Sequence, residues 1–237
     1  MKIYDITGRI SDGIWSYGFP FPDYHMRPLP QPEWVETRVW CEIFDGMNSQ
    51  TGTYLETPAH LLGPEKSYLL EDVPVEKLID VPVVHLALDP RMHVPGKRAK
   101  ITKQMLEDAL GDQKIDRSTA LLISCGWGEK WFDADYLDGS PYITRAAMEW
   151  IAAKKPFILG ADLPRWENLE KPEGIFPIFY DADILMLAPL VIPEELDCRG
   201  TTLTVLPIRV TGTCCAPCRA ILKGEYNDNE TGHPVQP

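Results

Sequence analysis

The most informative segment of the chain is residues 50–60, Gln50-Thr51-Gly52-Thr53-Tyr54-Leu55-Glu56-Thr57-Pro58-Ala59-His60. Imidazole is the side chain whose reference pKa, about 6.5, lies nearest neutrality, so His60 is the natural general acid or base. Glu56 could orient His60, or act as the base itself if a dry pocket raises the pKa of its carboxyl group. The stretch therefore predicts an acid/base site.

Two further side chains of the stretch could polarise a substrate. Tyr54 could donate a hydrogen bond to a developing oxyanion, and Gln50 could orient a substrate amide or a water molecule. We therefore predict a carbonyl-directed catalytic site made of His60, Glu56, Tyr54 and Gln50. A structural role for His60 remains the alternative.

The stretch resembles the signature His-x-Gly-Thr-His-x-Asp-x-Pro-x-His of the cyclase family, which includes bacterial kynurenine formamidase and isatin hydrolase. Four of its positions match: Gly52, Thr53, Pro58 and His60. Gln50, Tyr54 and Glu56 stand where the signature has His, His and Asp. The chain thus resembles a family member in which most of the metal-binding side chains are exchanged, and Tyr54 could also simply fill the vacated metal cavity.

The resemblance extends along nearly the whole chain. Further blocks follow in the family's order: Ile3 to Thr7, Leu122 to Gly128, Tyr136 to Pro141, Leu159 to Asp162, and Gly212 to Leu222. It implies an α/β fold of the swivelling β/β/α type, a mixed sheet with flanking helices, as a single domain over residues 1–237. It also implies a homodimer or homotetramer.

Members of this family bind one or two divalent metals, commonly zinc or manganese, which polarise a carbonyl and activate water. Gln50 offers only an amide oxygen, and Tyr54 offers a phenol, a group with a reference pKa of about 10. Both are weaker ligands than imidazole. We therefore expect no bound metal and no other cofactor.

A second family pattern, a His followed twelve positions later by a Glu, places Ala182 at the His position and Glu194 at the Glu position. Asp181 and Asp183 flank Ala182, so a shift of one residue could supply a carboxylate there. If zinc or manganese does bind, the resemblance implies Glu56, His60 and Glu194 as its ligands.

Hydrophobic patterning independently favours an α/β architecture. Apolar runs rich in branched residues predict strands at 81–88, 120–124, 156–160, 184–187 and 202–210. Helical spacing predicts helices at 102–110 and 144–154, each beginning at a threonine N-cap, Thr102 and Thr144.

The two ends of the chain differ from this pattern. Pro-rich residues from about 15 to 32 predict an ordered, rigid loop, and residues 225–237 predict a polar C-terminal tail. Aromatic residues of this loop could line a pocket for a flat substrate or pack a subunit interface; they are Trp15, Tyr17, Phe19, Phe21 and Tyr24. Arg165 and Trp166 lie three and four residues after Asp162. We also predict substrate contacts from these two, with Arg165 pairing with a carboxylate.

Composition limits the partners. A formal charge of −12, with 35 acidic and 23 basic side chains, argues against nucleic acid and anionic membranes. The chain opens without an apolar signal segment, so its six cysteines are expected to be free thiols in a cytoplasmic protein. Cys214, Cys215 and Cys218 are expected to be small buried thiols, with a redox or ligand role as the alternative.

Three classes of function fit these residues. The leading hypothesis is hydrolysis of a small amide, lactam or lactone, or the reverse ring closure, without a metal; its metal-dependent form would need rearranged ligands. The second is a metal-independent lyase or isomerase using the same residues. The third is a catalytically silent homologue that binds a small molecule.

Overall fold

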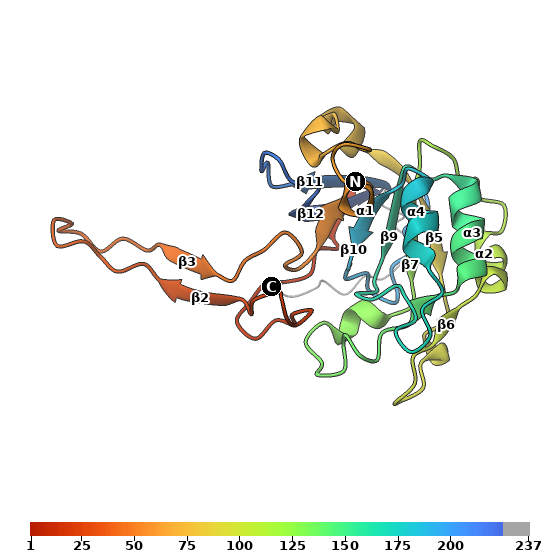
Figure 1. The fold of residues 1–237 in the computed structure, drawn as a ribbon, viewed down its shortest axis with the longest axis horizontal. Helices are drawn as coiled ribbons and strands as arrows, with labels where there is room; N and C mark the ends of the chain where they lie inside the picture. The colour runs from red at the N-terminus through yellow and green to blue at the C-terminus, as the bar shows by residue number, and fades with distance from the viewer. Residues whose placement is uncertain (225–237) are drawn as a thin grey trace.

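One eight-stranded sheet organises residues 1–224, the part of the chain that the computed structural model describes (Figure 1). The order of the strands is β1-β12-β11-β5-β7-β9-β10-β4, and β4 also pairs with β12, so seven strands close into a ring with β1 outside it. The strands are β1 (Lys2–Asp5), β4 (Tyr54–Glu56), β5 (Val81–Ala87), β7 (Ala120–Ser124), β9 (Ile158–Ala161), β10 (Leu185–Ala188), β11 (Thr202–Pro207) and β12 (Cys215–Gly224). β5, β7, β9 and β10 are parallel, and the remaining pairings are antiparallel.

Alternate side chains of the ring strands enter two different cores. On β7, Ala120 and Leu122 face the interior of the ring, while Leu121 and Ile123 face outward. The outward face is covered by α2 (Lys103–Leu110), α3 (Arg145–Lys154) and α4 (Ile175–Asp181), which lie together on one side in Figure 1. Both faces of the parallel strands are thus buried, which explains their unbroken apolar runs.

The remaining elements are short. They are α1 (Ala59–Leu62), the paired strands β6 (Lys100–Ile101) and β8 (Tyr142–Ile143), and single 3₁₀ turns at Leu70–Asp72, Val75–Leu78, Pro90–Met92 and Trp127–Lys130. Of these, α1 matters most for function, because it follows β4 within the 50–60 stretch.

The predicted mixed sheet with flanking helices is confirmed. All five strands and both helices predicted from hydrophobic patterning are present, with ends within three residues of the predicted ones. Thr102 caps α2, since its hydroxyl accepts a hydrogen bond from the Met105 amide. Thr144 is the N-cap residue of α3 as predicted, but its hydroxyl donates to the Ile101 carbonyl and does not accept from the helix.

Two features differ from the predictions. α4 was not predicted, since its sequence Ile175-Phe-Pro-Ile-Phe-Tyr-Asp181 contains a proline and no polar face. The Pro-rich segment is not only a loop: β2 (His25–Pro28) pairs with β3 (Glu42–Asp45) in an antiparallel hairpin.

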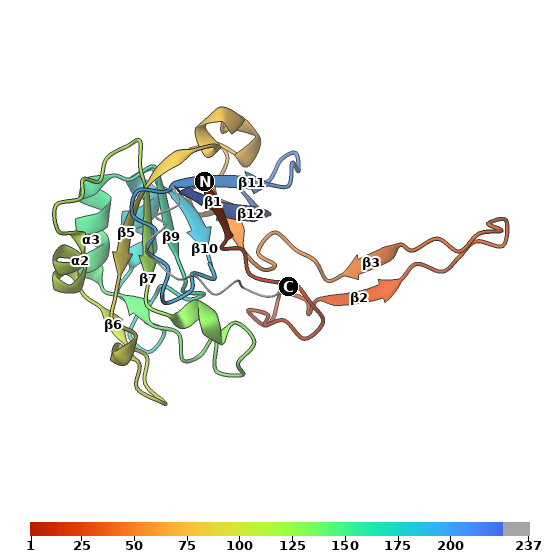
Figure 2. The same ribbon diagram turned by 180° about the vertical axis from the view of Figure 1, so that it is seen from behind.

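This hairpin, residues 25–45, forms an arm that projects far from the rest of the molecule (Figures 1 and 2). Several large side chains of the arm are exposed to solvent: Trp34 (82 %), Trp40 (74 %), Val39 (62 %) and Phe44 (53 %). In both views β1, β11 and β12 lie between the arm and the helices (Figure 2). Exposed apolar groups on this scale are typical of an interaction surface.

Residues 225–237, the predicted polar tail, lie outside the described part of the chain. Within residues 1–224 we find no helix with the length and apolar character needed to cross a bilayer.

Candidate active site

The retained residues of the 50–60 stretch shape its backbone. Gly52 has φ +71°, and a Cβ there would lie 2.7 Å from the Ile10 side chain, so only glycine fits. The buried Thr53 hydroxyl donates to the Pro189 carbonyl (2.6 Å) and accepts from the Gly8 amide (2.9 Å). These contacts fix the path of β4 and so aim the side chains that follow.

Glu56 is the centre of the site. It ends β4, has no exposed surface, and accepts hydrogen bonds on both carboxylate oxygens. Tyr180 of α4 donates to Oε1 in a short hydrogen bond, and Gln50 Nε2 donates to Oε2 at 3.0 Å. Cys215 lies directly opposite Glu56 in the β4–β12 register. The carboxylate is therefore held in a single orientation.

His60 completes the arrangement from α1. Its Nδ1 lies 3.2 Å from Glu56 Oε2, four residues earlier in the chain, and its side chain is 42 % exposed. The pair is an ion-pair contact, and the hydrogen-bond contact of Nδ1 is with Cys214 Sγ at 3.9 Å, so Nε2 is the nitrogen left to exchange protons with a substrate. Glu56 was predicted either to orient His60 or to act as the base itself. This geometry favours the first role, orientation of His60.

Burial raises the pKa of the Glu56 carboxyl, while the nearby His60 and the Tyr180 hydrogen bond act in the opposite direction. Burial also raises the pKa of the Tyr180 phenol, and the adjacent Glu56 charge adds to that effect. Tyr180 therefore remains a proton donor to the carboxylate.

Tyr54 has a different place from the one predicted. Its hydroxyl lies 3.2 Å from that of Tyr17, whose own proton goes to the Pro164 carbonyl at 3.0 Å, so Tyr54 is the donor to Tyr17. Burial holds the pKa of Tyr54 well above its usual value. The Tyr54 proton is therefore engaged with the N-terminal loop rather than directed at a substrate.

The cysteine cluster is divided between two environments. Cys214 Sγ lies 3.9 Å from His60 Nδ1, and the buried Cys215 thiol donates to the Ser49 carbonyl at 3.1 Å. Cys218 packs in the interior of the ring. Burial raises the pKa of all three thiols, so none is poised as a thiolate.

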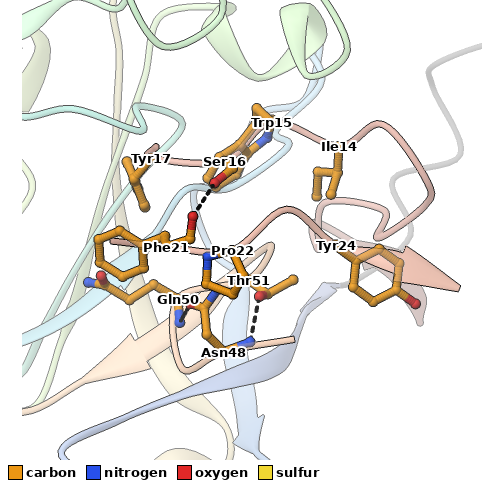
Figure 3. Close-up of a pocket in the computed structure, with 10 residues that line it drawn as sticks. All are labelled: Ile14, Trp15, Ser16, Tyr17, Phe21, Pro22, Tyr24, Asn48, Gln50 and Thr51. Atoms are coloured by element: carbon orange, nitrogen blue, oxygen red, sulfur yellow. Dashed lines mark hydrogen bonds between the residues drawn. The ribbon is translucent and has the colours of Figure 1, made fainter. Parts of the chain in front are cut away.

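The N-terminal loop lines a small cavity of about 10 Å³, which is room for about one water molecule. Trp15, Tyr17, Phe21 and Tyr24 all contribute to its wall, whereas Phe19 is fully exposed. Figure 3 shows Gln50 on the same wall beside Phe21. Because Gln50 also bonds Glu56, it links this cavity to the buried carboxylate.

The two candidates after Asp162 lie differently. Arg165 pairs through one guanidinium nitrogen with the exposed Asp138 at 3.1 Å. Trp166 is 2 % exposed, packs edge-on against Phe179 and donates its indole N–H to the Leu163 carbonyl. Trp166 is thus placed as a core residue, because no part of its ring faces the cavity wall.

The residues present do not fit a divalent metal of the family's type. Within residues 1–224, no group of three or more His, Cys, Asp and Glu side chains is arranged to hold one. Glu194, predicted as a ligand, instead lines a separate depression with His85 and Asp197. Asp183, which could have compensated for Ala182, pairs with Arg117 at 3.3 Å.

Sequence reasoning missed Tyr180 and did not place Cys215. Tyr180 lies in the unpredicted helix α4, two residues before Ala182, and nothing in its neighbourhood marked it. Cys215 was expected only to be a small buried thiol, and strand pairing opposite Glu56 gives that thiol a location.

A family model described as "Putative cyclase" matches residues 4–168, well over half of the chain. The chain belongs to the cyclase family. Among solved structures, an isatin hydrolase bound to the product analogue thioisatinate is similar, with 15 % identity, a TM-score of 0.78, and coverage of 94 % of this chain and 93 % of that one. Isatin hydrolase A from Labrenzia aggregata, bound to benzyl benzoate, gives 17 % identity, a TM-score of 0.77 and 93 % coverage of both chains.

A structure from Bacillus stearothermophilus, described as a predicted metal-dependent hydrolase, gives 20 % identity, a TM-score of 0.69, and coverage of 93 % of this chain and 97 % of that one. No significant match was found among curated protein sequences. The expected cyclase-family fold is confirmed, and at these identities the similar structures show the fold alone.

Proposed function

We propose that this cyclase-family chain hydrolyses a small amide, lactam or lactone, or closes the corresponding ring, without a metal. The observation that supports the proposal is the contact between the partly exposed His60 and the fully buried Glu56 at 3.2 Å. A buried carboxylate close to one imidazole nitrogen favours the protonated form of the ring, so the other nitrogen can act as the base.

In the proposed hydrolysis, Nε2 of His60 removes a proton from water as the water oxygen attacks the carbonyl carbon. Glu56 stabilises the imidazolium that results, as a buried partner carboxylate does in other hydrolases. The imidazolium then returns its proton to the departing nitrogen or oxygen as the carbonyl–heteroatom bond breaks. Gln50 retains one amide N–H and its carbonyl oxygen to orient the substrate, because a single N–H is engaged with Glu56.

The substrate proposal comes from the similar structures and from the cavity. One similar protein is an isatin hydrolase bound to the product analogue thioisatinate, and the cavity here has aromatic walls. We propose that the wall residues Trp15, Tyr17 and Phe21 bind a small planar or cyclic carbonyl compound. Arg165 is proposed to bind a substrate carboxylate in exchange for Asp138.

The test is turnover of formyl-aryl amides, bicyclic lactams and aromatic lactones, with and without a chelator, beside elemental analysis of the untagged protein. Turnover that persists in a metal-free sample and falls in His60→Ala is expected. Turnover that depends on added zinc or manganese would overturn the metal-independent mechanism. Solvent deuterium entering a substrate without net water addition would instead identify a lyase or isomerase.

One observation favours a second candidate, a catalytically silent binding protein. The Tyr54 ring is 4 % exposed, and its hydroxyl is tied to Tyr17, as expected of a side chain that fills a former metal cavity. This candidate predicts ligand-induced thermal stabilisation without product over the same compounds.

We also propose that the chain forms a homodimer or homotetramer in the cytoplasm. The projecting arm supports assembly, since Trp34 and Trp40 would gain burial only against another chain. Six free cysteines support the location.

A further inference from the structure

Cys214 places a thiol beside the proposed acid/base residue. Its Sγ lies 3.9 Å from Nδ1 of His60, close enough for the S–H group to donate to that nitrogen, and the residue is partly exposed. The same imidazole nitrogen lies 3.2 Å from the buried Glu56 carboxylate. A thiol, an imidazole and a carboxylate in contact have the arrangement of a nucleophile, its base and a group that orients the base.

The backbone holds Cys214 in this place. The Thr57 amide donates to the Cys214 carbonyl at 2.8 Å, and the next residue, Cys215, pairs with Glu56 in the β4–β12 register. The Thr57 carbonyl in turn accepts from the His60 amide at 3.1 Å, at the start of α1. The thiol and the imidazole therefore belong to one hydrogen-bonded backbone frame, and the fold sets the contact between them.

The other cysteines of residues 1–224 have different surroundings. Cys125, Cys198, Cys215 and Cys218 are buried. Cys41 is exposed, and it lies on the arm that projects away from the sheet (Figure 1). The chain thus contains a reference thiol that meets solvent far from His60.

A thiol supplies what this site otherwise lacks. Water, with a pKa of about 15.7, becomes a strong nucleophile at neutral pH when a bound metal lowers that value, and the described residues offer no ligand set for one. A free cysteine has a pKa of about 8.5 and is intrinsically very nucleophilic. Burial and the charge of Glu56 raise the pKa of Cys214, so the group needs His60 to take its proton as it attacks.

We propose that Cys214 is the nucleophile of this chain, and that the hydrolysis passes through an acyl thioester on its sulfur. The proposal deepens the proposed function, on which it rests for the class of reaction. It makes the thiol, instead of water, the first group to attack the carbonyl carbon, and it keeps His60 as the acid and base of both halves of the reaction.

The two nitrogens of His60 balance the protons. Nδ1 takes the thiol proton as Sγ attacks the carbonyl carbon, and Nε2 gives its proton to the departing nitrogen or oxygen as that bond breaks. Nε2 then takes a proton from water as the water oxygen attacks the thioester carbon. The carbon–sulfur bond breaks, and Nδ1 returns its proton to the sulfur. Glu56 stabilises the imidazolium in each half.

The test is acyl transfer from p-nitrophenyl acetate to the full chain, quenched at early times and followed by mass spectrometry of the digested protein. This activated ester reports the thioester even when the natural substrate is unknown. Cys214 is expected to gain an acetyl group that hydroxylamine removes. His60→Ala should slow acetylation of Cys214 about 100-fold and leave that of Cys41 unchanged, so Cys41 serves as the internal control.

Turnover supplies a second readout. With a compound that the wild type hydrolyses, Cys214→Ala should lower kcat by about 100-fold or more. Its melting temperature should stay close to that of the wild type, because the side chain is small and partly exposed. Cys41→Ser is the matched control, since it also removes one thiol, and it should retain full activity.

Two results would overturn the nucleophile: acetylation of Cys214 at the same rate in wild type and His60→Ala, or full turnover by Cys214→Ala. If Cys214→Ala is fully active while His60→Ala is inactive, the proposed function stands and water is the attacking group. Turnover that is lost on chelation would overturn the metal-independent function instead, and the acetylation comparison would still decide the role of Cys214.

Discussion

Nδ1 of His60 lies 3.2 Å from Oε2 of Glu56, yet the two side chains have opposite surroundings, one 42 % exposed and the other without exposed surface. The imidazole can therefore meet a substrate while its partner carboxylate stays out of water. The charge of Glu56 stabilises a His60 imidazolium most strongly in this arrangement, because water screens a buried charge poorly.

His60→Ala should lower kcat about 100- to 10,000-fold, the usual contribution of a positioned acid/base residue. Its effect on stability should be small, because the side chain is partly exposed. Leu61→Ala, which alters a 47 % exposed neighbour on α1, is the control and should retain activity. Equal loss of activity in both variants would point to damage of α1 rather than to chemistry.

Glu56→Gln should change how stability depends on pH. Burial raises the pKa of Glu56 above its ordinary value of 4.5, so the folded chain keeps this proton at pH values where the unfolded chain has lost it. Its contribution to stability is therefore present below about pH 4.5 and is lost as pH rises through the folded-state pKa. Urea unfolding across this range should show wild type losing stability relative to Glu56→Gln as pH rises; a constant difference would contradict the raised pKa.

Tyr180→Phe should leave Oε1 of Glu56 without its donor. The loss should destabilise the chain by about 1–3 kcal/mol, because the acceptor stays buried. The Tyr180 bond lowers the pKa of Glu56, so its removal should move the acidic limb of the pH–activity profile upward. Phe176→Leu, which changes the ring stacked on Tyr180, should not shift that limb.

The double variant Trp34→Ser, Trp40→Ser should dissociate the proposed oligomer, as measured by light scattering after gel filtration. Phe132→Ser is the matched control, since Phe132 is 59 % exposed but lies outside the arm. Wild-type protein that already runs with the mass of one chain would refute assembly through the arm.

Much of the fold could be predicted from sequence, because the parallel strands of the ring are buried on both faces. β7 is a run of five buried residues, and such runs stand out in any sequence. α4 could not be predicted this way, since its buried aromatic residues and its proline hide the helical period. The arm was missed because β2 and β3, the strands that pair in it, lie in two segments whose sequences each indicate a loop.

The candidate site was predictable only in part. Glu56 and His60 are neighbours in sequence, so a motif reveals them together. Tyr180 reaches Glu56 from a helix 124 residues later, a relationship that depends on the closure of the ring. Glu194, named as a ligand only for the metal-bound alternative, lines a depression with His85 and Asp197, a location that the sequence pattern did not indicate.

The hydrogen-bonded chain from Tyr54 through Tyr17 to the Pro164 carbonyl ties the exchanged signature position to a loop nearly forty residues earlier. Replacing Tyr54 with the histidine of the family signature would remove the Tyr54–Tyr17 hydrogen bond. That bond is one of the contacts that position the loop lining the cavity. Position 54 and the N-terminal loop are therefore expected to depend on each other, because a change at either Tyr54 or Tyr17 alone leaves a buried hydroxyl of the other residue without this partner.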